Sequence, residues 1–332
     1  MTFTIASKLN DPVFGEYDLP IRMFIEQKAE SYAQNSQLSS MFLMMDSKKH
    51  AESVGEMAGM EGPQPVGENG TYPETEWGMG RMKDFRHMTW KNRLSFSREA
   101  VDDSQILDLK TRPEAFVAAH YRTREEFGAA LYGAACEGAT SFTYKGKSFD
   151  ASANDGLALF ASHVNKVNKA TQVNGFTDAF SATALAAAET AMQNLTGEVG
   201  ETLALCPNTI MIPNDYVLKM EVFAALGADK QPGSANNDYN FVFGRYNVII
   251  NPYLNKFITG GKKPWILLDT VYRDSYAGAL WFDRVDMEIT PMIDPGNDAL
   301  VYKEYSRWSA GFSDWRFALA GGMASGGTLV TG

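Results

Sequence analysis

The clearest pattern of apolar and polar positions lies in residues 81–98. Its later half alternates with a period of two, which is typical of a β-strand. Apolar side chains occupy its even positions Met88, Trp90, Leu94 and Phe96. Residues 60–77 are acidic and rich in Gly and Pro, whereas residues 81–98 hold six basic residues and a single acidic one, Asp84. We predict a long hairpin with an acidic and a basic limb, and such a hairpin needs a covering surface.

A capped helix is expected next along the chain. Thr111 can cap its start, Glu114 completes a capping box, and Pro113 falls in the first turn. Gly138 stands just past the last apolar position, where a helix commonly ends. The helix over about residues 112–138 would be roughly 40 Å long at 1.5 Å per residue. It predicts a central spine for the fold.

Residues 175–272 alternate between strand and helix patterns, which indicates a compact α/β region. The expected elements are a helix from Ser181, a buried strand at 209–212, a helix capped by Asp215, and strands in 241–254 and 264–272.

The two ends of the chain differ. Long strands are expected at 279–292, 299–312 and 314–322. Residues 1–58 instead predict a loose arm, with one amphipathic helix starting near Pro20 and an extended stretch that has little to pack on within its own chain.

The composition and charge argue against some classes of function. The 332 residues are 45% hydrophobic and suffice for about two domains. A net charge of −10 argues against a protein whose main task is to grip nucleic acid by its phosphates. Cys136 and Cys206 are expected to be reduced structural thiols. The sequence shows no signal peptide and no long apolar run, so we expect a protein made in a reducing cytoplasm without membrane contact.

Residues 311–315 resemble the nucleophile elbow of hydrolases, with Ser313 as the nucleophile. The fifth position is Trp315 where the motif needs Gly, and no helix pattern follows. We therefore expect Ser313 to lie in a strand and turn. The neighbouring aromatic residues Trp308, Trp315 and Phe317 are expected to pack in the core.

Three further candidate binding sites fail. Residues 145–148 resemble the end of a phosphate-binding loop, but the earlier glycine is replaced by Ser141. The four histidines are widely separated. Asp283 and Asp286 would face opposite sides of a strand, so together with Glu288 they predict a solvated strand face. No catalytic, cofactor or metal site is predicted.

Segments that cannot bury themselves indicate a protein that assembles with copies of itself. Several stretches resemble the major capsid proteins of tailed bacteriophages, which have the Hong Kong ninety-seven-like fold, and within them the Mu-like head subunit group. The stretches that carry the resemblance are LSFSREAVDDS at 94–104, NDGLALFASHVN at 154–165, PNTIMIPNDYVLKMEVFAAL at 207–226, DRVDMEITPM at 283–292 and RWSAGFSDWRFALAGG at 307–322.

The resemblance implies an α+β fold with a discontinuous layout. The implied parts are an N-terminal arm at 1–58, an extended loop at 59–104, a peripheral domain at 105–174 and 273–325 that includes the spine helix, and an axial domain at 175–272.

It also implies a structural role without enzymatic activity or cofactors. Copies would form hexamers and pentamers that close into an icosahedral head around double-stranded DNA, in the virion, after assembly in the bacterial cytoplasm. Separate scaffolding, portal or decoration proteins are further candidate partners, and packaged DNA would make weak non-specific contacts. Since extended loops lie on neighbouring subunits in this family, the residues expected at inter-subunit contacts are Arg86, Trp90, Lys91, Arg93 and Phe96.

Two alternatives stay open at the level of sequence. An encapsulin-like compartment would use the same fold to hold enzyme cargo. A soluble hydrolase would use Ser313 as its nucleophile.

Overall fold

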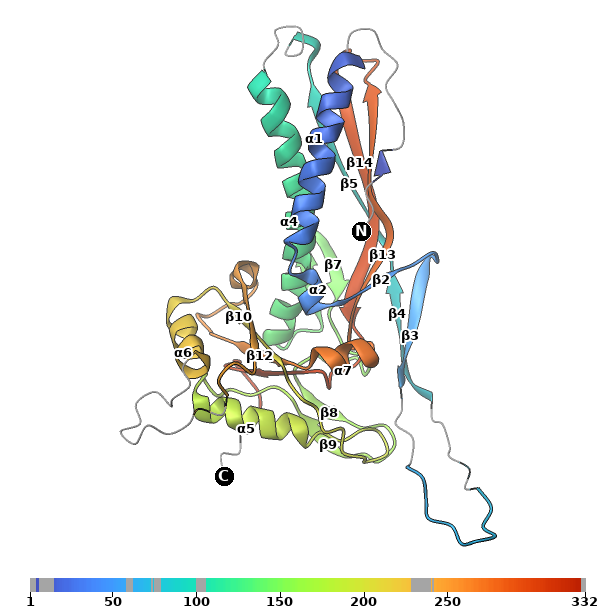
Figure 1. Cartoon of the computed structure of the whole chain (residues 1–332), viewed down its shortest axis with the longest axis vertical. Coiled ribbons are helices and arrows are strands. Elements are labelled where there is room, and N and C mark those ends of the chain that lie inside the picture. Colours follow the sequence, from blue (N-terminus) through green and yellow to red (C-terminus); the bar gives the residue numbers. More distant parts are fainter. Residues whose placement is uncertain are drawn as a thin grey trace. The chain divides into compact units, whose positions relative to one another are not determined.

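The computed structural model forms two compact units that both combine helices and sheets, which confirms the predicted α+β class. Unit 1 comprises residues 1–52, 85–128 and 281–310, and unit 2 comprises residues 53–84, 129–280 and 311–332. Figure 1 labels the helices and strands. Within both units the structure describes residues 4–5, 15–57, 62–72, 74, 79–99, 106–227, 240 and 242–329.

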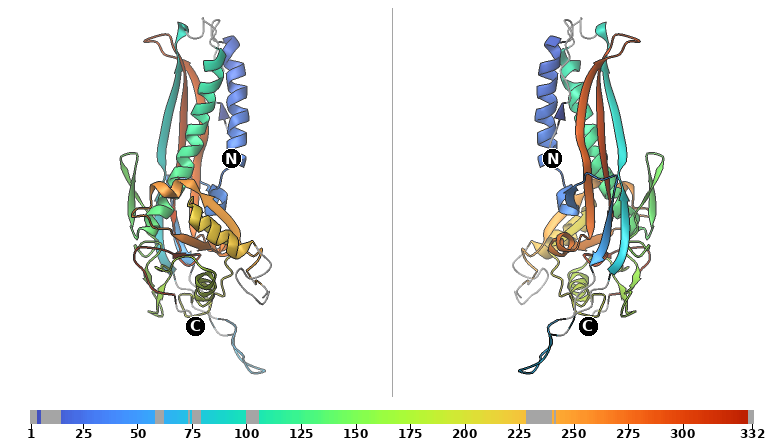
Figure 2. Two further views of the ribbon diagram at one scale, coloured as in Figure 1. Left: turned by 90° about the vertical axis from the view of Figure 1, so that its left-hand side faces the viewer. Right: turned by 90° about the vertical axis from the view of Figure 1, so that its right-hand side faces the viewer.

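Unit 1 is built on one sheet with the strand order β1-β13-β14-β5, in which β2 also pairs with β13. Its strands are β1 (Thr4–Ile5), β2 (Leu43–Asp46), β5 (Met88–Phe96), β13 (Ala279–Ile293) and β14 (Leu300–Phe312). Its helices are α1 (Gly15–Gln34), α2 (Leu38–Met41) and the first part of α4 (Ile106–Cys136). Helices α1 and α4 run side by side along the long strands (Figures 1 and 2).

Strand β5 is an integral strand of this sheet. It pairs antiparallel with β14 over nine residues, from Phe96 opposite Leu300 to Met88 opposite Trp308. The prediction that residues 81–98 form the basic limb of a two-stranded hairpin is therefore wrong for β5. The reason is that a strand about 200 residues further along the chain supplies the partner, which no local pattern reveals.

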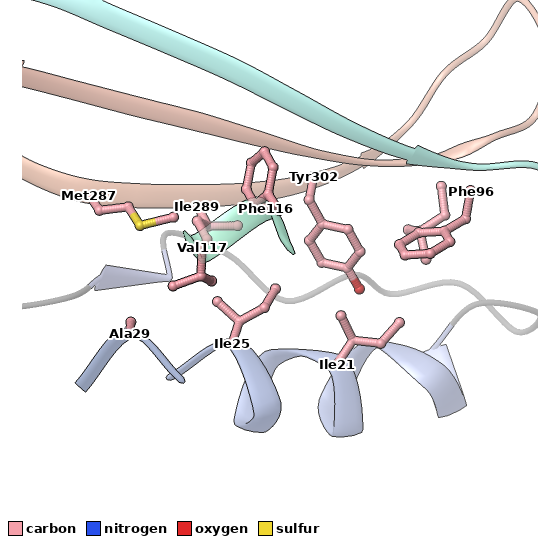
Figure 3. Close-up of a cluster of buried hydrophobic side chains, with 10 residues drawn as sticks. Ile21, Ile25, Ala29, Phe96, Phe116, Val117, Met287, Ile289 and Tyr302 are labelled. Atoms are coloured by element: carbon pink, nitrogen blue, oxygen red, sulfur yellow. The ribbon is translucent and has the colours of Figure 1, made fainter. Parts of the chain in front are cut away.

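The helix of the N-terminal arm packs within its own unit. Ile21, Ile25 and Ala29 on α1 are buried and point toward Ile289 on β13 and Tyr302 on β14 (Figure 3). Phe96, Phe116, Val117, Met287 and Leu300 complete the buried cluster. The expectation that the arm has little to pack on is wrong, because its apolar stripe and the inner face of the sheet cover each other.

The spine helix is present but begins earlier than the capping pattern predicts. Helix α4 runs from Ile106, so Pro113 lies inside it instead of in the first turn. A proline there removes one backbone donor and crowds the carbonyl four residues earlier, and it lies in the second turn of a helix of 31 residues. The end agrees with the prediction to within two residues, and Gly138 just beyond it adopts a φ of +70° that favours glycine.

A buried ion pair links the spine helix to the sheet. Arg124 on α4 donates two hydrogen bonds to the carboxylate of Asp283 on β13, at 2.8 and 2.7 Å, and the Trp281 indole donates a third at 3.1 Å. Trp308 stacks on Trp281 and on Trp90 beside this pair. The predicted solvated strand face is thus wrong for Asp283, which is buried by its arginine partner.

Unit 2 contains a four-stranded sheet with the order β11-β10-β12-β15. Its strands are β10 (Thr209–Pro213), β11 (Asn247–Asn251), β12 (Trp265–Leu268) and β15 (Ala318–Gly321). Its helices are α5 (Ala182–Gln193), α6 (Tyr216–Leu226), the short 3-10 helix η1 (Pro252–Lys256) and α7 (Thr270–Ser275). The helix start predicted at Ser181 and the cap predicted at Asp215 are confirmed, since Ser181 accepts from the Ala184 amide and Asp215 from the Leu218 amide.

The other strands of unit 2 form two-stranded pairs. They are β3 (Ala51–Met57) with β4 (Met79–Arg86), β6 (Ser141–Tyr144) with β7 (Lys147–Asp150), and β8 (Ser162–Val164) with β9 (Thr171–Val173). The phosphate-loop-like stretch is the tight turn of the β6–β7 hairpin, where Lys145 and Gly146 both have positive φ. The strand predicted at 264–272 ends at Leu268, because the Asp269 side chain caps α7.

Candidate subunit-contact surfaces

The face of β5 and β14 that points away from α1 and α4 carries a row of basic side chains. We call Lys91, Arg93, Lys303 and Arg307 the basic ladder. The strand register places Arg93 directly opposite Lys303, and Lys91 opposite Tyr305, with the Lys91 ammonium 5.9 Å from the Tyr305 ring centre. Like charges on directly opposed residues destabilise a sheet. The ladder therefore concentrates positive charge on one face of the sheet.

The intervening side chains of the same two strands face inward. Phe96 is fully buried against Tyr302, and Glu304 bonds the His120 imidazole at 2.5 Å. Trp90 stacks on Trp308 with ring centres 4.4 Å apart. The pleat thus separates an aromatic inner face from a basic outer face.

The five predicted contact residues consequently divide into two groups. Arg86, Lys91 and Arg93 are exposed, which leaves them accessible to another subunit. The half-buried Trp90 packs on its own chain, and Phe96 has no exposed surface at all. We correct the prediction for the Phe96 side chain, since the apolar positions of the alternating pattern turned out to serve the core of their own unit.

His87 lies between β4 and β5. Its ring nitrogens lie 3.0 Å from the hydroxyls of Ser309 and Ser47. Burial lowers the pKa of His87, and the charges of Arg284 and Arg307 lower it further. The imidazole is therefore neutral near pH 7 and bridges two neutral hydroxyls.

The base of the β3–β4 pair is held within unit 2 by Arg316. Its guanidinium bonds Glu56 of β3 at 2.9 Å, Glu198 at 2.7 Å and Asp314 at 3.1 Å. The same group donates to Asn165 at 2.9 Å. All five side chains are buried, so the network fixes Glu56 where the hairpin leaves the body of the unit.

The charges of this network do not cancel. Three carboxylates surround one guanidinium, and burial raises the pKa of Glu56 despite its bond to Arg316. Burial also opposes the charge on Arg316, but Asp314 and Glu56 outweigh it and raise the Arg316 pKa. Glu198 keeps a lowered pKa through its bonds to Glu56 and Arg316, which outweigh its burial. Of Glu56 and Glu198, Glu56 is thus the carboxyl that takes up a proton more readily.

Beyond its base the β3–β4 pair leads into an exposed acidic segment, which we call the acidic loop, residues 62–74. All its described residues are exposed, and the Tyr72 side chain is 98% exposed. The Gly70 amide donates to the Gly67 carbonyl at 2.8 Å, which forms a tight turn. Glu68 and Glu74 stand on this segment, and the sequence has no Lys or Arg between His50 and Arg81.

Helix α6 presents an apolar face to solvent. Leu218 and Val222 face inward and are buried. The opposite side carries Tyr216, Val217, Met220 and Phe223, which are all exposed. A helix that is apolar on both sides is typical of an element with a partner on each side.

Sequence reasoning missed two features of these surfaces. Lys303 and Arg307 join the ladder only through the β5–β14 register, although their spacing of four in a strand is a visible signal for a shared face. The second feature is the outer face of α6. The sequence predicts the helix, and its apolar residues are too many for a single stripe, which is the signal for a second apolar face.

The described residues around Ser313 do not form a nucleophile elbow. Ser313 is 1% exposed, and the segment after it leads into β15 instead of a helix. No group of three or more His, Cys, Asp or Glu residues within the described ranges could hold a metal ion. Among the described helices, none is long and apolar enough to cross a membrane.

A match to a protein-family model and matches to solved structures connect the chain to known proteins. A family model described as phage capsid protein matches residues 83–321, well over half of the chain. No curated protein matches the sequence.

Solved structures with a similar fold include two phage capsids. The capsid of Ralstonia phage GP4 has a TM-score of 0.52 and 9% identity, over 86% of this chain and 88% of that chain. The capsid of cyanophage P-SCSP1u has a TM-score of 0.50 and 8% identity, over 86% of this chain and 87% of that chain. At such identities the likeness shows the fold alone, and it agrees with the Hong Kong ninety-seven-like fold that the sequence resembles.

The family match covers the spine helix, the long strands and the α/β region together. The placement within a Mu-like group stays a prediction. An exposed basic face, an exposed apolar helix and a projecting acidic loop are features of a subunit that contacts its copies. The chain belongs to the phage capsid protein family.

Proposed function

We propose that copies of this chain form hexamers and pentamers that close into a phage head around double-stranded DNA. The observation that carries this proposal is the apolar outer face of α6. Large exposed apolar side chains are unfavourable in water, at about 25 cal/mol per Å² of apolar surface. Contiguous patches of this kind mark protein interfaces. In a self-assembling shell every subunit has neighbouring copies, and we propose that one of them covers this apolar face.

We infer the same domain layout that the family resemblance implies. Residues 1–58 serve as the arm, 59–104 as the extended loop, 105–174 with 273–325 as the peripheral domain, and 175–272 as the axial domain. Helix α6 lies in the axial range, so its apolar face would meet the next copy around a five- or sixfold axis. Head-to-tail contacts of this kind close into rings.

The exposed basic residues are the second proposed contact. Arg86, Lys91 and Arg93 would contact a neighbouring subunit, as their exposure permits. Trp90 and Phe96 would support this surface from the inside by fixing β5 in its sheet. Scaffolding, portal and decoration proteins are further proposed partners, DNA contacts would be weak and non-specific, and assembly would take place in the host cytoplasm.

A double substitution on α6 tests the proposal. Met220→Glu with Phe223→Glu places two charges on the apolar face, and we expect folded subunits that no longer form closed shells in electron micrographs. Met220→Leu with Phe223→Leu keeps the face apolar and should assemble like the unmodified chain. Normal shells from the glutamate variant would refute the role of α6.

An encapsulin-like compartment is the alternative with the same fold. The contents of particles purified from cells distinguish the two. Nuclease-protected DNA supports a head, whereas protein cargo without DNA supports a compartment.

A further inference from the structure

Unit 1 contains a cavity of about 830 Å³ that is lined by residues of α1, β2, α4 and β13, and we call it the acidic cavity. Its lining holds five carboxylates and one guanidinium, that of Arg124, which is already paired with Asp283. The carboxylates of Glu26, Glu30 and Asp46 have no partner among the described residues. The cavity therefore keeps an excess of negative charge, and its volume is within the range of small-molecule sites.

Helix α1 supplies two of these carboxylates from one side. Glu26 and Glu30 lie four residues apart, and like charges at this spacing destabilise a helix. Ala29 and Ala33 also line the cavity, and their small side chains leave room beside the helix. The helix thus holds two neighbouring negative charges over an open space, and a bound cation would stabilise this arrangement.

His120 on α4 indicates a ligand independently of the carboxylates. It lines the cavity, although only 7% of its surface is exposed. Its Nδ1 lies 2.5 Å from a carboxylate oxygen of Glu304, and no described residue bonds its Nε2. When Nδ1–H donates to that carboxylate, the Nε2 of the neutral ring is an acceptor. A buried acceptor is unfavourable until a donor reaches it, so this nitrogen suits a ligand with N–H groups.

The arrangement of the lining does not suit a compact metal ion. No three His, Cys, Asp or Glu side chains in the described ranges are close enough together to hold one. The carboxylates come from α1, β2 and β13, so they are distributed around the cavity. Met44, Met45 and Met287 add flexible thioether side chains that pack well on methylene groups. Separate carboxylates together with such apolar surface fit a linear molecule whose ammonium groups are joined by methylenes.

We propose that the acidic cavity binds a linear polyamine. Its ammonium groups pair with Glu26, Glu30 and Asp46, and one of them donates to the Nε2 of His120. The bound molecule connects the helix of the N-terminal arm with the sheet, because these side chains belong to α1, β2 and α4. This inference concerns the single subunit and does not rest on the proposed assembly.

Calorimetric titration of the full chain with spermidine, under non-assembling conditions, tests the proposal. We expect saturable binding that also raises the unfolding temperature of the subunit, because the ligand binds only the folded state. Glu26→Gln with Glu30→Gln should weaken this binding about tenfold, since two charge pairs of the complex are lost. Both side chains are exposed, so the substitutions leave the packing of α1 intact.

The part played by His120 has a spectroscopic test. In nitrogen NMR spectra of the unmodified chain, the Nε2 resonance of His120 should shift when spermidine is added. The resonances of His87 serve as the internal control, because its ring nitrogens already lie 3.0 Å from the hydroxyls of Ser309 and Ser47. They should stay unchanged.

A matched variant and a matched probe separate a built site from general attraction to an acidic protein. Glu68→Gln with Glu74→Gln removes the same charge from exposed residues outside the cavity, and this variant should bind spermidine like the unmodified chain. Hexaamminecobalt(III) is triply charged like spermidine but compact. It should bind about tenfold more weakly, because it cannot reach the separate carboxylates together.

The inference would be overturned by any of four results. They are no saturable binding of spermidine, equal weakening in the Glu68 and Glu74 variant, equally tight binding of hexaamminecobalt(III), and an unchanged Nε2 resonance of His120. A cavity that binds an oligolysine peptide but no spermidine would be a site for a basic segment of another protein instead. Failure of the proposed function is separate, because it would show in the imaging of shells and not in these titrations of subunits.

Discussion

Helices α1 and α6 both carry apolar residues on a side that the isolated helix would expose to water. On α1 the stripe of Ile21, Ile25 and Ala29 is buried by the sheet of its own unit. On α6 the stripe that includes Met220 and Phe223 stays exposed. The subunit completes the stripe on α1 by itself, and we propose that it leaves the stripe on α6 for its copies. Burial on α1 contributes to folding, whereas burial on α6 would contribute only to assembly.

The largest expected effect concerns the buried network that the chain completes by itself. Arg316→Ala leaves Glu56, Glu198 and Asp314 buried without their cation, and we expect a loss of about 3–5 kcal/mol in the free energy of unfolding. Urea unfolding of the subunit under non-assembling conditions measures it. Lys49→Ala is the control, since water and salt screen its pair with Glu52 at the surface and its loss should change stability little. Equal losses in both variants would contradict the account.

A smaller effect is expected on α1. Ile25→Ala removes a fully buried side chain and should cost about 2–5 kcal/mol of subunit stability. Met23→Ala on the same helix changes a side chain that is 62% exposed and should stay within about 0.5 kcal/mol. The same unfolding measurement compares them. If Ile25→Ala left the subunit equally stable but prevented shells, α1 would be an element completed by other copies, as the sequence alone had led us to expect.

The sequence predicted the elements whose signals are local. Side-chain caps at Ser181 and Asp215 marked two helix starts correctly, because a cap depends only on residues within one turn. The long strands at 279–292 and 299–312 were confirmed nearly to the residue, since alternation is a local signal as well.

Pairings between distant segments could not be predicted in the same way. Nothing near residues 88–96 indicates that β14 is the partner, so the sequence predicts a hairpin limb where the structure has a strand of a larger sheet. Burial of Asp283 depends on Arg124, 159 residues earlier. For the same reason Trp90 and Phe96 were assigned to a neighbouring subunit, although their rings pack on Trp308 and Tyr302.

For the candidate contact surface, the sequence predicts exposed basic residues but not the side chains that face inward. Their contact with another subunit stays a prediction. The local excess of basic residues in 81–98 led to Arg86, Lys91 and Arg93, which are exposed. The aromatic members of the same pattern belong to the inner face. To predict the exposed apolar face of α6, one must know which side of the helix is buried in its own unit, and that is tertiary information.

Hydroxyl-radical footprinting of Met220 and Phe223 tests the central claim most directly. In isolated subunits both side chains should be oxidised readily, because 57% and 49% of their surfaces are exposed. The buried Met211 serves as the internal reference that stays unreacted in both states. The account predicts strong protection of Met220 and Phe223 in assembled shells. Equal oxidation in subunits and shells would contradict it.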